Sequence, residues 1–204
     1  MKTKVGKFQD QELIQEIKNG NVVAFPTETV YGLGVISNSK EAFERLVETK
    51  KRSPDKPFTL MLSKKEDIEK YAKISKKTKR VIDKFMPGEI TILVPPKEHL
   101  DSWITLNSKY IGIRISGMNE VSLMIDQVGL PMLVTSANIS GEETLNSFEG
   151  AYRVFNGKIS YLVNGETSSK LPSTIVICDE NIELVRLGSI SFEEIKKVWE
   201  ENIW

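Results

Sequence analysis

Apolar residues recur along this chain with two different spacings, which alternate from one end of the sequence to the other. A helical spacing over residues 10–19 predicts an amphipathic helix that Gly20 ends. Ser39 can cap a second helix, which has to end before Pro54. The alternation of helical and extended segments, without a linker or repeat, favours a single α/β domain over residues 1–204.

Two Ser-x-x-Glu patterns predict the starts of further helices, because such a serine and glutamate can cap each other's backbone N–H groups. The expected helices are residues 64–73 after Ser63 with Glu66, residues 192–202 after Ser191 with Glu194, and, without such a box, residues 120–128.

Short runs rich in β-branched residues predict the strands. They cover residues 22–25, 90–94, 111–115, 132–134, 161–163, 174–177 and 182–187, with 58–62 as an eighth candidate. The runs alternate irregularly between apolar and polar positions. We therefore expect a sheet of about seven strands with mixed parallel and antiparallel pairing and flanking helices.

The composition narrows the class of protein. Lys and Arg number 28, and so do Asp and Glu, which argues against a dedicated nucleic-acid binder. The single cysteine, Cys178, lies in an apolar run and reads as a buried strand thiol, so disulfides and cysteine metal sites are not expected. No stretch resembles a signal peptide or a membrane span, so we expect a cytoplasmic protein without membrane contact.

Polar clusters directly follow two of the predicted strands, at residues 26–29 and 135–138. Ligands of open α/β sheets bind at the carboxyl ends of strands, so both clusters are candidate site walls, although turns and helix caps use the same residue types. Phosphate-loop, dinucleotide, serine-hydrolase and zinc-protease motifs are absent, and the only histidine, His99, reads as a surface residue.

What remains is a scattered set of basic, hydroxyl and amide side chains next to predicted strand or helix ends. The set comprises Lys50, Arg52, Lys56, Arg114, Ser136, Asn138, Ser173 and Arg186. Such side chains suit a polyphosphate, although any single lysine among them can simply be a solvated charge. Arg114 and Arg186 stand out, because an unpaired guanidinium beside an apolar strand is costly to bury.

Several segments, in order, resemble the Sua5/YrdC/TsaC family of threonylcarbamoyl-AMP synthases. They are Phe25-Pro-Thr-Glu-Thr-Val-Tyr-Gly-Leu-Gly34, Lys50-Lys-Arg52 with Asp55-Lys-Pro57, Pro87-Gly-Glu-Ile-Thr91, Ile111-Gly-Ile-Arg-Ile115, Thr135-Ser-Ala-Asn-Ile-Ser-Gly141, and Pro172-Ser-Thr174 with Arg186-Leu-Gly-Ser-Ile-Ser191. The resemblance implies a twisted, open YrdC-like sheet with a positively lined cleft. It also implies a nucleotidyltransferase that forms threonylcarbamoyl-AMP and pyrophosphate from L-threonine, bicarbonate and ATP.

The resemblance further implies a role for each matching residue. Thr29, Arg114 and Ser136 would contact threonine, whereas the expected ATP contacts are Lys50, Arg52, Lys56, Asn138, Asn146, Ser173 and Arg186. Lys50 and Arg52 would carry the catalytic charge stabilisation. No dedicated metal site is expected, and Mg²⁺ would arrive with ATP. The product would pass to a tRNA threonylcarbamoyl transferase complex for N6-threonylcarbamoyladenosine formation, and direct contact with tRNA is a further expectation.

The chain also departs from the family pattern. Lys56 stands where many members have asparagine, and Met61 where many have a histidine near the threonine. Glu89 and Leu187 replace common prolines, and residues 116–120 replace a Pro-x-His-Pro segment. The chain ends about 18 residues after Arg186, so the resemblance is to the short form without an extra C-terminal domain.

Two other functions remain open from the sequence. Lysines at 50 and 51, 64 and 65, and 76, 77 and 79 with Arg80 could form a face that binds RNA without ATP turnover, although solvated helix faces explain them more simply. A carbamoyl-transfer module of hydrogenase maturation proteins has the same fold. That module normally lies in a longer chain with zinc-finger elements, which one cysteine cannot supply.

Overall fold

The computed structural model describes residues 2–53, 57–169 and 171–201. Its helices are α1 (Gln11–Lys18), α2 (Lys40–Lys50), α3 (Ile68–Tyr71), α4 (Lys76–Phe85), α5 (Ser102–Thr105), α6 (Asn119–Val128), α7 (Phe148–Phe155) and α8 (Phe192–Glu200), with the 3-10 turn η1 (Lys65–Asp67) before α3. Its strands are β1 (Lys4–Gly6), β2 (Val23–Pro26), β3 (Tyr31–Ile36), β4 (Thr59–Met61), β5 (Ile90–Val94), β6 (Ile111–Arg114), β7 (Met132–Ser136), β8 (Tyr161–Val163), β9 (Thr174–Cys178) and β10 (Ile182–Arg186).

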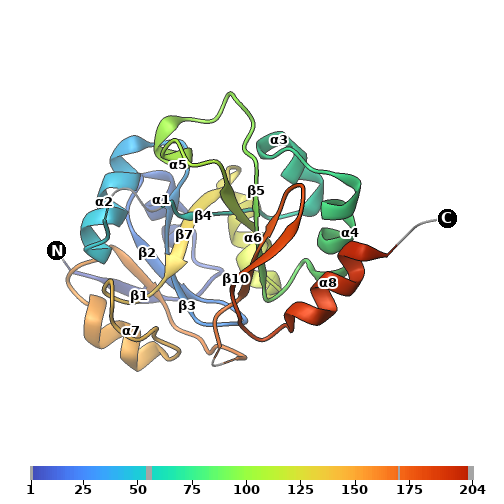
Figure 1. The fold of residues 1–204 in the computed structure, drawn as a ribbon. Helices are drawn as coiled ribbons and strands as arrows, with labels where there is room; N and C mark the ends of the chain where they lie inside the picture. Colours follow the sequence, from blue (N-terminus) through green and yellow to red (C-terminus); the bar gives the residue numbers. More distant parts are fainter. Residues whose placement is uncertain (1, 54–56, 170, 202–204) are drawn as a thin grey trace.

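The described strands form one ten-stranded sheet in the order β1-β8-β2-β3-β7-β4-β6-β5-β9-β10. Four neighbouring pairs are parallel, namely β1 with β8, β2 with β8, β4 with β6 and β5 with β9. The other pairs are antiparallel, which confirms the expected mixed sheet. Figure 1 shows the curved sheet with α1 and α2 near one end and the packed pair α4 and α8 near the other.

The sheet is larger than the sequence predicted, with ten strands instead of about seven. All the predicted strands form, including the eighth candidate, which is β4. The two missed strands are β1, which has only three residues, and β3, where Gly32 and Gly34 interrupt the apolar run that marks a strand. Both glycines lie close to Phe25 and Val134, and there the missing side chains leave room for close packing between neighbouring strands.

Four of the five predicted helices form: α1 and α6 without a side-chain cap, and α2 and α8 with a serine cap. The helices α4 and α7, which Ser75 and Ser147 cap, were not predicted. Ser39 Oγ accepts a hydrogen bond from the Ala42 N–H at the start of α2, and Ser191 does so from the Glu194 N–H at α8. The predicted box at Ser63 is wrong: the chain there forms η1, which has no side-chain cap, and then the single turn α3. The backbone turns again at Ala72, which is extended and bridges to Pro96, so the expected helix over residues 64–73 breaks up.

Alternation along the central strands gives the sheet two different faces. Leu60, Ile92, Ile113 and Leu133 share one face and belong to the hydrophobic core. Their neighbours on the other face line a cavity and include glycine, hydroxyl and arginine residues. The alternate positions of the same strands therefore build both the core and the candidate site.

Cys178 is buried and His99 is exposed, as the sequence indicated. Cys178 is a free thiol at the end of β9, and its burial raises its pKa to about 12. Within the described ranges, no helix has the length and hydrophobicity needed to cross a bilayer.

Ser39 and Ser63 give a matched stability test, because Ser39 caps a helix and Ser63 does not. Ser39→Ala removes the hydrogen bond to Ala42 N and is expected to lower the free energy of unfolding by about 1 kcal/mol. Ser63→Ala removes no cap and is expected to change it by less than about 0.5 kcal/mol. Urea denaturation of both variants checks this, and equal losses would contradict the assignment of the caps.

Candidate active site

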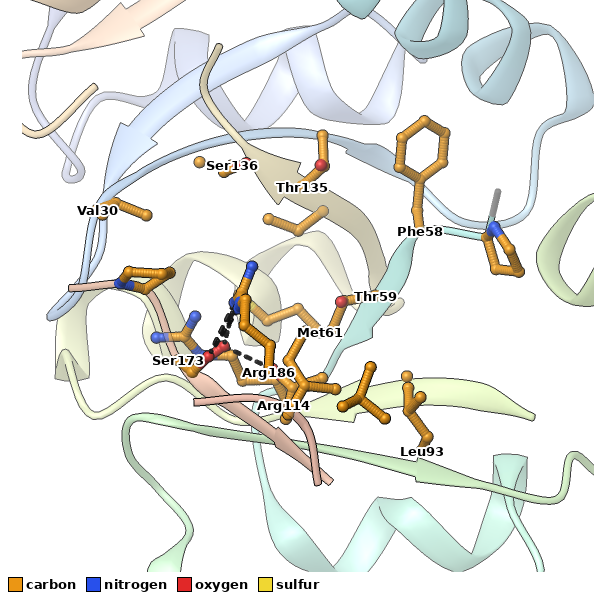
Figure 2. Close-up of a pocket in the computed structure, with 18 of the residues that line it drawn as sticks. Val30, Phe58, Thr59, Met61, Leu93, Arg114, Thr135, Ser136, Ser173 and Arg186 are labelled. Atoms are coloured by element: carbon orange, nitrogen blue, oxygen red, sulfur yellow. Dashed lines mark hydrogen bonds between the residues drawn. The ribbon is translucent and has the colours of Figure 1, made fainter. Parts of the chain in front are cut away.

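A cavity of about 360 Å³ opens on the polar face of the sheet. Its walls come from seven neighbouring strands, β3, β7, β4, β6, β5, β9 and β10, together with the segments that precede β3, β4, β6 and β9. Gly112 forms part of the floor, where a Cβ atom would lie only 3.3 Å from Thr59 Oγ1 and 3.4 Å from a Leu93 methyl group. Figure 2 shows the side chains of Met61, Arg114, Ser173 and Arg186 gathered at this hollow.

The charged residues on the cavity wall are all arginines. Arg52 precedes β4, Arg114 is the last residue of β6, and Arg186 is the last residue of β10. Among the described residues, no aspartate or glutamate lines the same cavity. The cavity is therefore electropositive and suited to an anionic ligand.

Arg114 is held by two residues of the segment after β2. Its Nη2 donates to Glu28 Oε1 at 2.7 Å and to Thr29 Oγ1 at 2.8 Å. Thr29 is fully buried, and Arg114 is only 7% exposed. The Nε atom of Arg114 is buried without a hydrogen-bond partner among the described residues. A buried donor without an acceptor is costly in a folded protein and often marks a ligand contact.

Glu28 lies behind the cavity wall with both carboxylate oxygens engaged. Oε1 accepts from Arg114, and Oε2 accepts from the Ser116 hydroxyl. Burial alone would raise the pKa of Glu28, but the charge of Arg114 and hydrogen bonds from Gly117 N–H and Ser116 outweigh it and lower the pKa below its usual value. Glu28 is therefore an anion at neutral pH and the counter-charge of Arg114.

Arg186 and Ser173 meet beside Arg114 on the cavity wall (Figure 2). Arg186 donates from Nη2 and Nε to the Ser173 carbonyl at 2.8 and 3.2 Å. The Ser173 hydroxyl shares a hydrogen bond with Thr91 Oγ1 at 2.9 Å. Partial burial, and secondarily the positive charge of Arg114, lower the pKa of Arg186. The two arginines therefore repel each other beside a cavity that an anion would stabilise.

Lys50 joins the end of α2 to the loop after β7. Its Nζ donates to the Ser136 carbonyl at 2.6 Å, to Asn138 Oδ1 at 2.6 Å and to the Asn138 carbonyl at 3.1 Å. Lys50 is 2% exposed and lies behind Ser136 instead of on the cavity wall. Burial, and secondarily the charge of Arg52, lower the pKa of Lys50 to about 8.

Arg52 follows α2 and reaches the opposite rim of the cavity. Its guanidinium lies over the ring of Phe58, 5.2 Å from the ring centroid, and Nη2 donates to the Pro57 carbonyl at 3.1 Å. An aromatic face stabilises a cation without using up its hydrogen-bond donors. Lys56, the neighbouring candidate, lies outside the described residues.

The structure therefore brings together most of the described residues that the sequence singled out, but not all of them. Five line the cavity, namely Arg52, Arg114, Ser136, Ser173 and Arg186. Thr29, Lys50 and Asn138 lie behind these residues and hold them or their loops. Asn146 is exposed and is not part of the cavity wall. Its backbone carbonyl accepts a hydrogen bond from Thr167 Oγ1.

Sequence reasoning missed residues that act through these candidates. Glu28 lies in the polar segment after β2, but an acidic side chain does not by itself indicate an anion site. Thr91 also lines the cavity, and alternation along β5 is the signal that could have placed it there.

The chain is similar to known proteins both in sequence and in structure. The sequence profile of the family Sua5_yciO_yrdC, described as telomere recombination, matches residues 15–188. The chain belongs to the Sua5/YciO/YrdC family. The threonylcarbamoyl-AMP synthase of Pyrococcus abyssi is 34% identical over 185 residues, which are 89% of this chain and 54% of that protein. The threonylcarbamoyl-AMP synthase of Buchnera aphidicola subsp. Baizongia pistaciae is 33% identical over 168 residues, 81% of this chain and 90% of that protein.

A solved structure of this family has the same fold. The structure of P. abyssi Sua5 complexed with L-threonine superposes with a TM-score of 0.89 and 30% identity, covering 97% of this chain and 61% of that one. The chain thus spans about half the length of its P. abyssi relative by sequence and nine tenths of the Buchnera one.

The buried position of Lys50 predicts a pH effect on stability. The folded protein releases the proton near pH 8, whereas an unfolded lysine keeps it to about pH 10.5, so the unfolded state binds more protons between these values. The free energy of unfolding of the wild type, minus that of Lys50→Met, should therefore rise with pH in this window, by up to about 1 kcal/mol per pH unit.

Urea denaturation at pH 7 to 10 measures this difference. Tyr31 and Tyr161, whose pKa values burial raises, are present in both proteins and cancel in the difference. Parallel pH curves for the two proteins would contradict a lowered pKa of Lys50.

Proposed function

We propose that this chain is an L-threonylcarbamoyladenylate synthase, a nucleotidyltransferase that forms threonylcarbamoyl-AMP and pyrophosphate from L-threonine, bicarbonate and ATP. One observation carries the proposal: Arg52, Arg114 and Arg186, from distant parts of the chain, line one cavity with the hydroxyls of Ser136 and Ser173. Membership of the family and the names of its relatives support it. The proposal treats residues 1–204 as one domain.

On the amino-acid side, Arg114, Thr29 and Ser136 would hold threonine. The Arg114 guanidinium has Nη1 and the buried Nε without a hydrogen bond within the described ranges, so it can pair with a carboxylate. Met61 packs beside Arg114 on the same face, where the side chain of the substrate would meet an apolar surface. The threonine complex of the P. abyssi relative supports the choice of ligand.

On the nucleotide side, Arg52, Ser173 and Arg186 would hold the phosphates of ATP directly. Lys50, at the end of α2, adds positive charge from behind the wall and fixes Asn138 in the loop after β7 through its Oδ1 and carbonyl, so both would act on the nucleotide from behind the wall. Lys56 and Asn146 remain proposed ATP contacts on the resemblance alone.

The chemistry needs no general base from the protein. The threonine amine and bicarbonate give a carbamate anion and water, whereas the amine and CO2 give the carbamate and a proton that passes to solvent. A carbamate oxygen then forms the new bond to the α-phosphorus while the bond to pyrophosphate breaks. The protein has to align two anions and offset the charge that collects on the phosphate oxygens. Three arginines around one cavity provide that charge.

Magnesium fits this proposal as part of the substrate. Among the described residues, no three carboxylate, imidazole or thiol groups lie together so that they could hold a metal ion. The guanidinium and hydroxyl groups of the cavity wall suit phosphate oxygens instead. Mg²⁺ would therefore arrive on ATP and neutralise part of its phosphate charge.

The adenylate is a reactive acyl phosphate, so a second protein has to consume it. We propose that a cytoplasmic tRNA threonylcarbamoyl transferase complex takes the group to tRNA. Direct tRNA contact of this chain is a secondary proposal.

The RNA-binding alternative finds less support in the structure. Three lysines of its proposed basic face pair with carboxylates within 4.0 Å, namely Lys64 with Asp126, Lys65 with Asp83 and Lys79 with Glu69. Arg80 donates to two backbone carbonyls at the end of α8. Each surface pair is weak, but together they interleave charges of both signs on this face.

The direct test incubates the purified protein with ATP, bicarbonate and labelled L-threonine. Pyrophosphate and a labile threonine-containing adenylate are expected, and omission of threonine or bicarbonate should abolish both. Turnover of carbamoyl phosphate without threonine would favour the carbamoyl-transfer function instead. Salt-sensitive RNA binding without any pyrophosphate would favour the RNA-binding function.

Arg52→Ala is expected to lower the rate of pyrophosphate release at least about tenfold, because it removes roughly 1.4 kcal/mol or more of transition-state stabilisation. Arg153→Ala is the matched control, since Arg153 is exposed on α7 and does not line the cavity. A folded Arg52→Ala protein with the wild-type rate would count against the proposed role of Arg52.

A further inference from the structure

Glu28 is an acidic group that contacts the cavity-lining Arg114, although Glu28 itself does not line the cavity. It lies one residue before Thr29 in the segment that joins β2 to β3, and it is 9% exposed. An acid at such a place opposes the binding of anions unless another group neutralises its charge. The contacts of the Glu28 carboxylate therefore determine whether its charge weakens or strengthens the binding of an anion in the cavity.

Among the described residues, the hydrogen bonds to the Glu28 carboxylate come from β6 and the segment after it. Oε1 accepts from Arg114 Nη2 at 2.7 Å, and Oε2 accepts from Ser116 Oγ. The Gly117 N–H also bonds to this carboxylate. Because the carboxylate is fixed from the Ser116 side, it holds the guanidinium in one orientation.

This contact occupies only one end of the guanidinium. The two hydrogens of Nη2 go to Glu28 and Thr29. Within the part of the chain that the structure describes, Nη1 and Nε have no hydrogen-bond acceptor, and Arg114 still lines the cavity. A guanidinium fixed at one nitrogen presents the others in a defined direction, which a planar carboxylate can use.

The packing around Glu28 leaves it little freedom to move. A Cβ atom added at Gly117 would lie 3.3 Å from Glu28 Cγ and 3.5 Å from Cδ. The backbone carbonyl of Glu28 accepts from Ser169 N at 2.9 Å, which anchors the residue from its other side. The side chain and the main chain of Glu28 are thus both fixed.

We propose that Glu28 is a positioning residue for the amino-acid substrate: it orients Arg114 so that the free side of the guanidinium receives the substrate carboxylate. The inference rests on the proposed function and adds to it a residue that does not touch the substrate. The charge of Glu28 also cancels that of Arg114 when the site is empty. The arginine can then be buried without an anion, and the other two arginines are left for the phosphates.

The test measures steady-state kinetics of pyrophosphate release by Glu28→Gln, which keeps the shape of the side chain but removes its charge. The KM for L-threonine is expected to rise about tenfold, while the KM for ATP and the kcat at saturating threonine change by less than about threefold. Glu44→Gln is the matched control, because Glu44 is exposed on α2 and pairs only with Lys40 at 3.5 Å. A purely structural role would lower the melting temperature and kcat without a selective change in the KM for threonine.

Ser116→Ala keeps the test decisive if Glu28→Gln does not fold. It removes one hydrogen bond to Oε2 and leaves the ion pair in place, so a selective two- to fivefold rise in the KM for threonine is expected. An unchanged KM for threonine in every folded variant would overturn the inference.

The inference and the proposed function fail in different ways. If the wild type makes no adenylate, the proposed function is wrong. Calorimetric titration of L-threonine into the wild type and Glu28→Gln then still tests the positioning role, with about tenfold weaker binding expected for the variant. Equal affinities would overturn it. If the wild type is active and Glu28→Gln keeps the wild-type KM for threonine, only the positioning role is wrong.

Discussion

The candidate site depends on the burial of Arg114 beside the cavity. The carboxylate of Glu28, which lies behind the cavity wall, offsets the charge of this arginine. A guanidinium that is 7% exposed is tolerated only when a counter-charge and hydrogen bonds replace the lost water. Glu28 and Thr29 supply both through Nη2 of Arg114, and Ser116 fixes the carboxylate in turn. The compensation is incomplete, because Nε keeps no partner within the described ranges. Binding of an anion that accepts a hydrogen bond from Nε would therefore stabilise the site.

The curved mixed sheet makes that arrangement possible. Arg114 and Arg186 end strands β6 and β10, which β5 and β9 separate in the sheet. Because side chains alternate between the two faces, the core on one face fixes the positions of the cavity residues on the other. The Lys50 contacts then attach α2 to the loop after β7, so that Ser136 and Asn138 are fixed by a helix as well as by a strand.

The sequence predicted the strands with apolar, β-branched runs and the helices α1, α2, α6 and α8, but not α4 and α7, although Ser75 and Ser147 cap them. It failed where the signal is short or broken, as in the three-residue β1 and in β3 with Gly32 and Gly34. The box at Ser63 failed because tertiary pairing of Ala72 with Pro96 competes with a continuous helix. Local pattern therefore decides long elements, while tertiary contacts decide short ones.

For the site, the residue types of the arginines and hydroxyls were sufficient to mark them as candidate anion ligands, and five of the candidates line one cavity. Glu28 could not be found in that way, since its role depends on Arg114, which lies 86 positions away in the sequence. Asn146 stays a prediction of the resemblance alone, and its side chain is exposed and not on the cavity wall. The most direct measurement is a crystal structure of this protein with L-threonine and a non-hydrolysable ATP analogue. The account predicts the threonine carboxylate on Arg114 and the phosphates between Arg52 and Arg186, whereas ligands bound elsewhere, with this cavity empty, would contradict it.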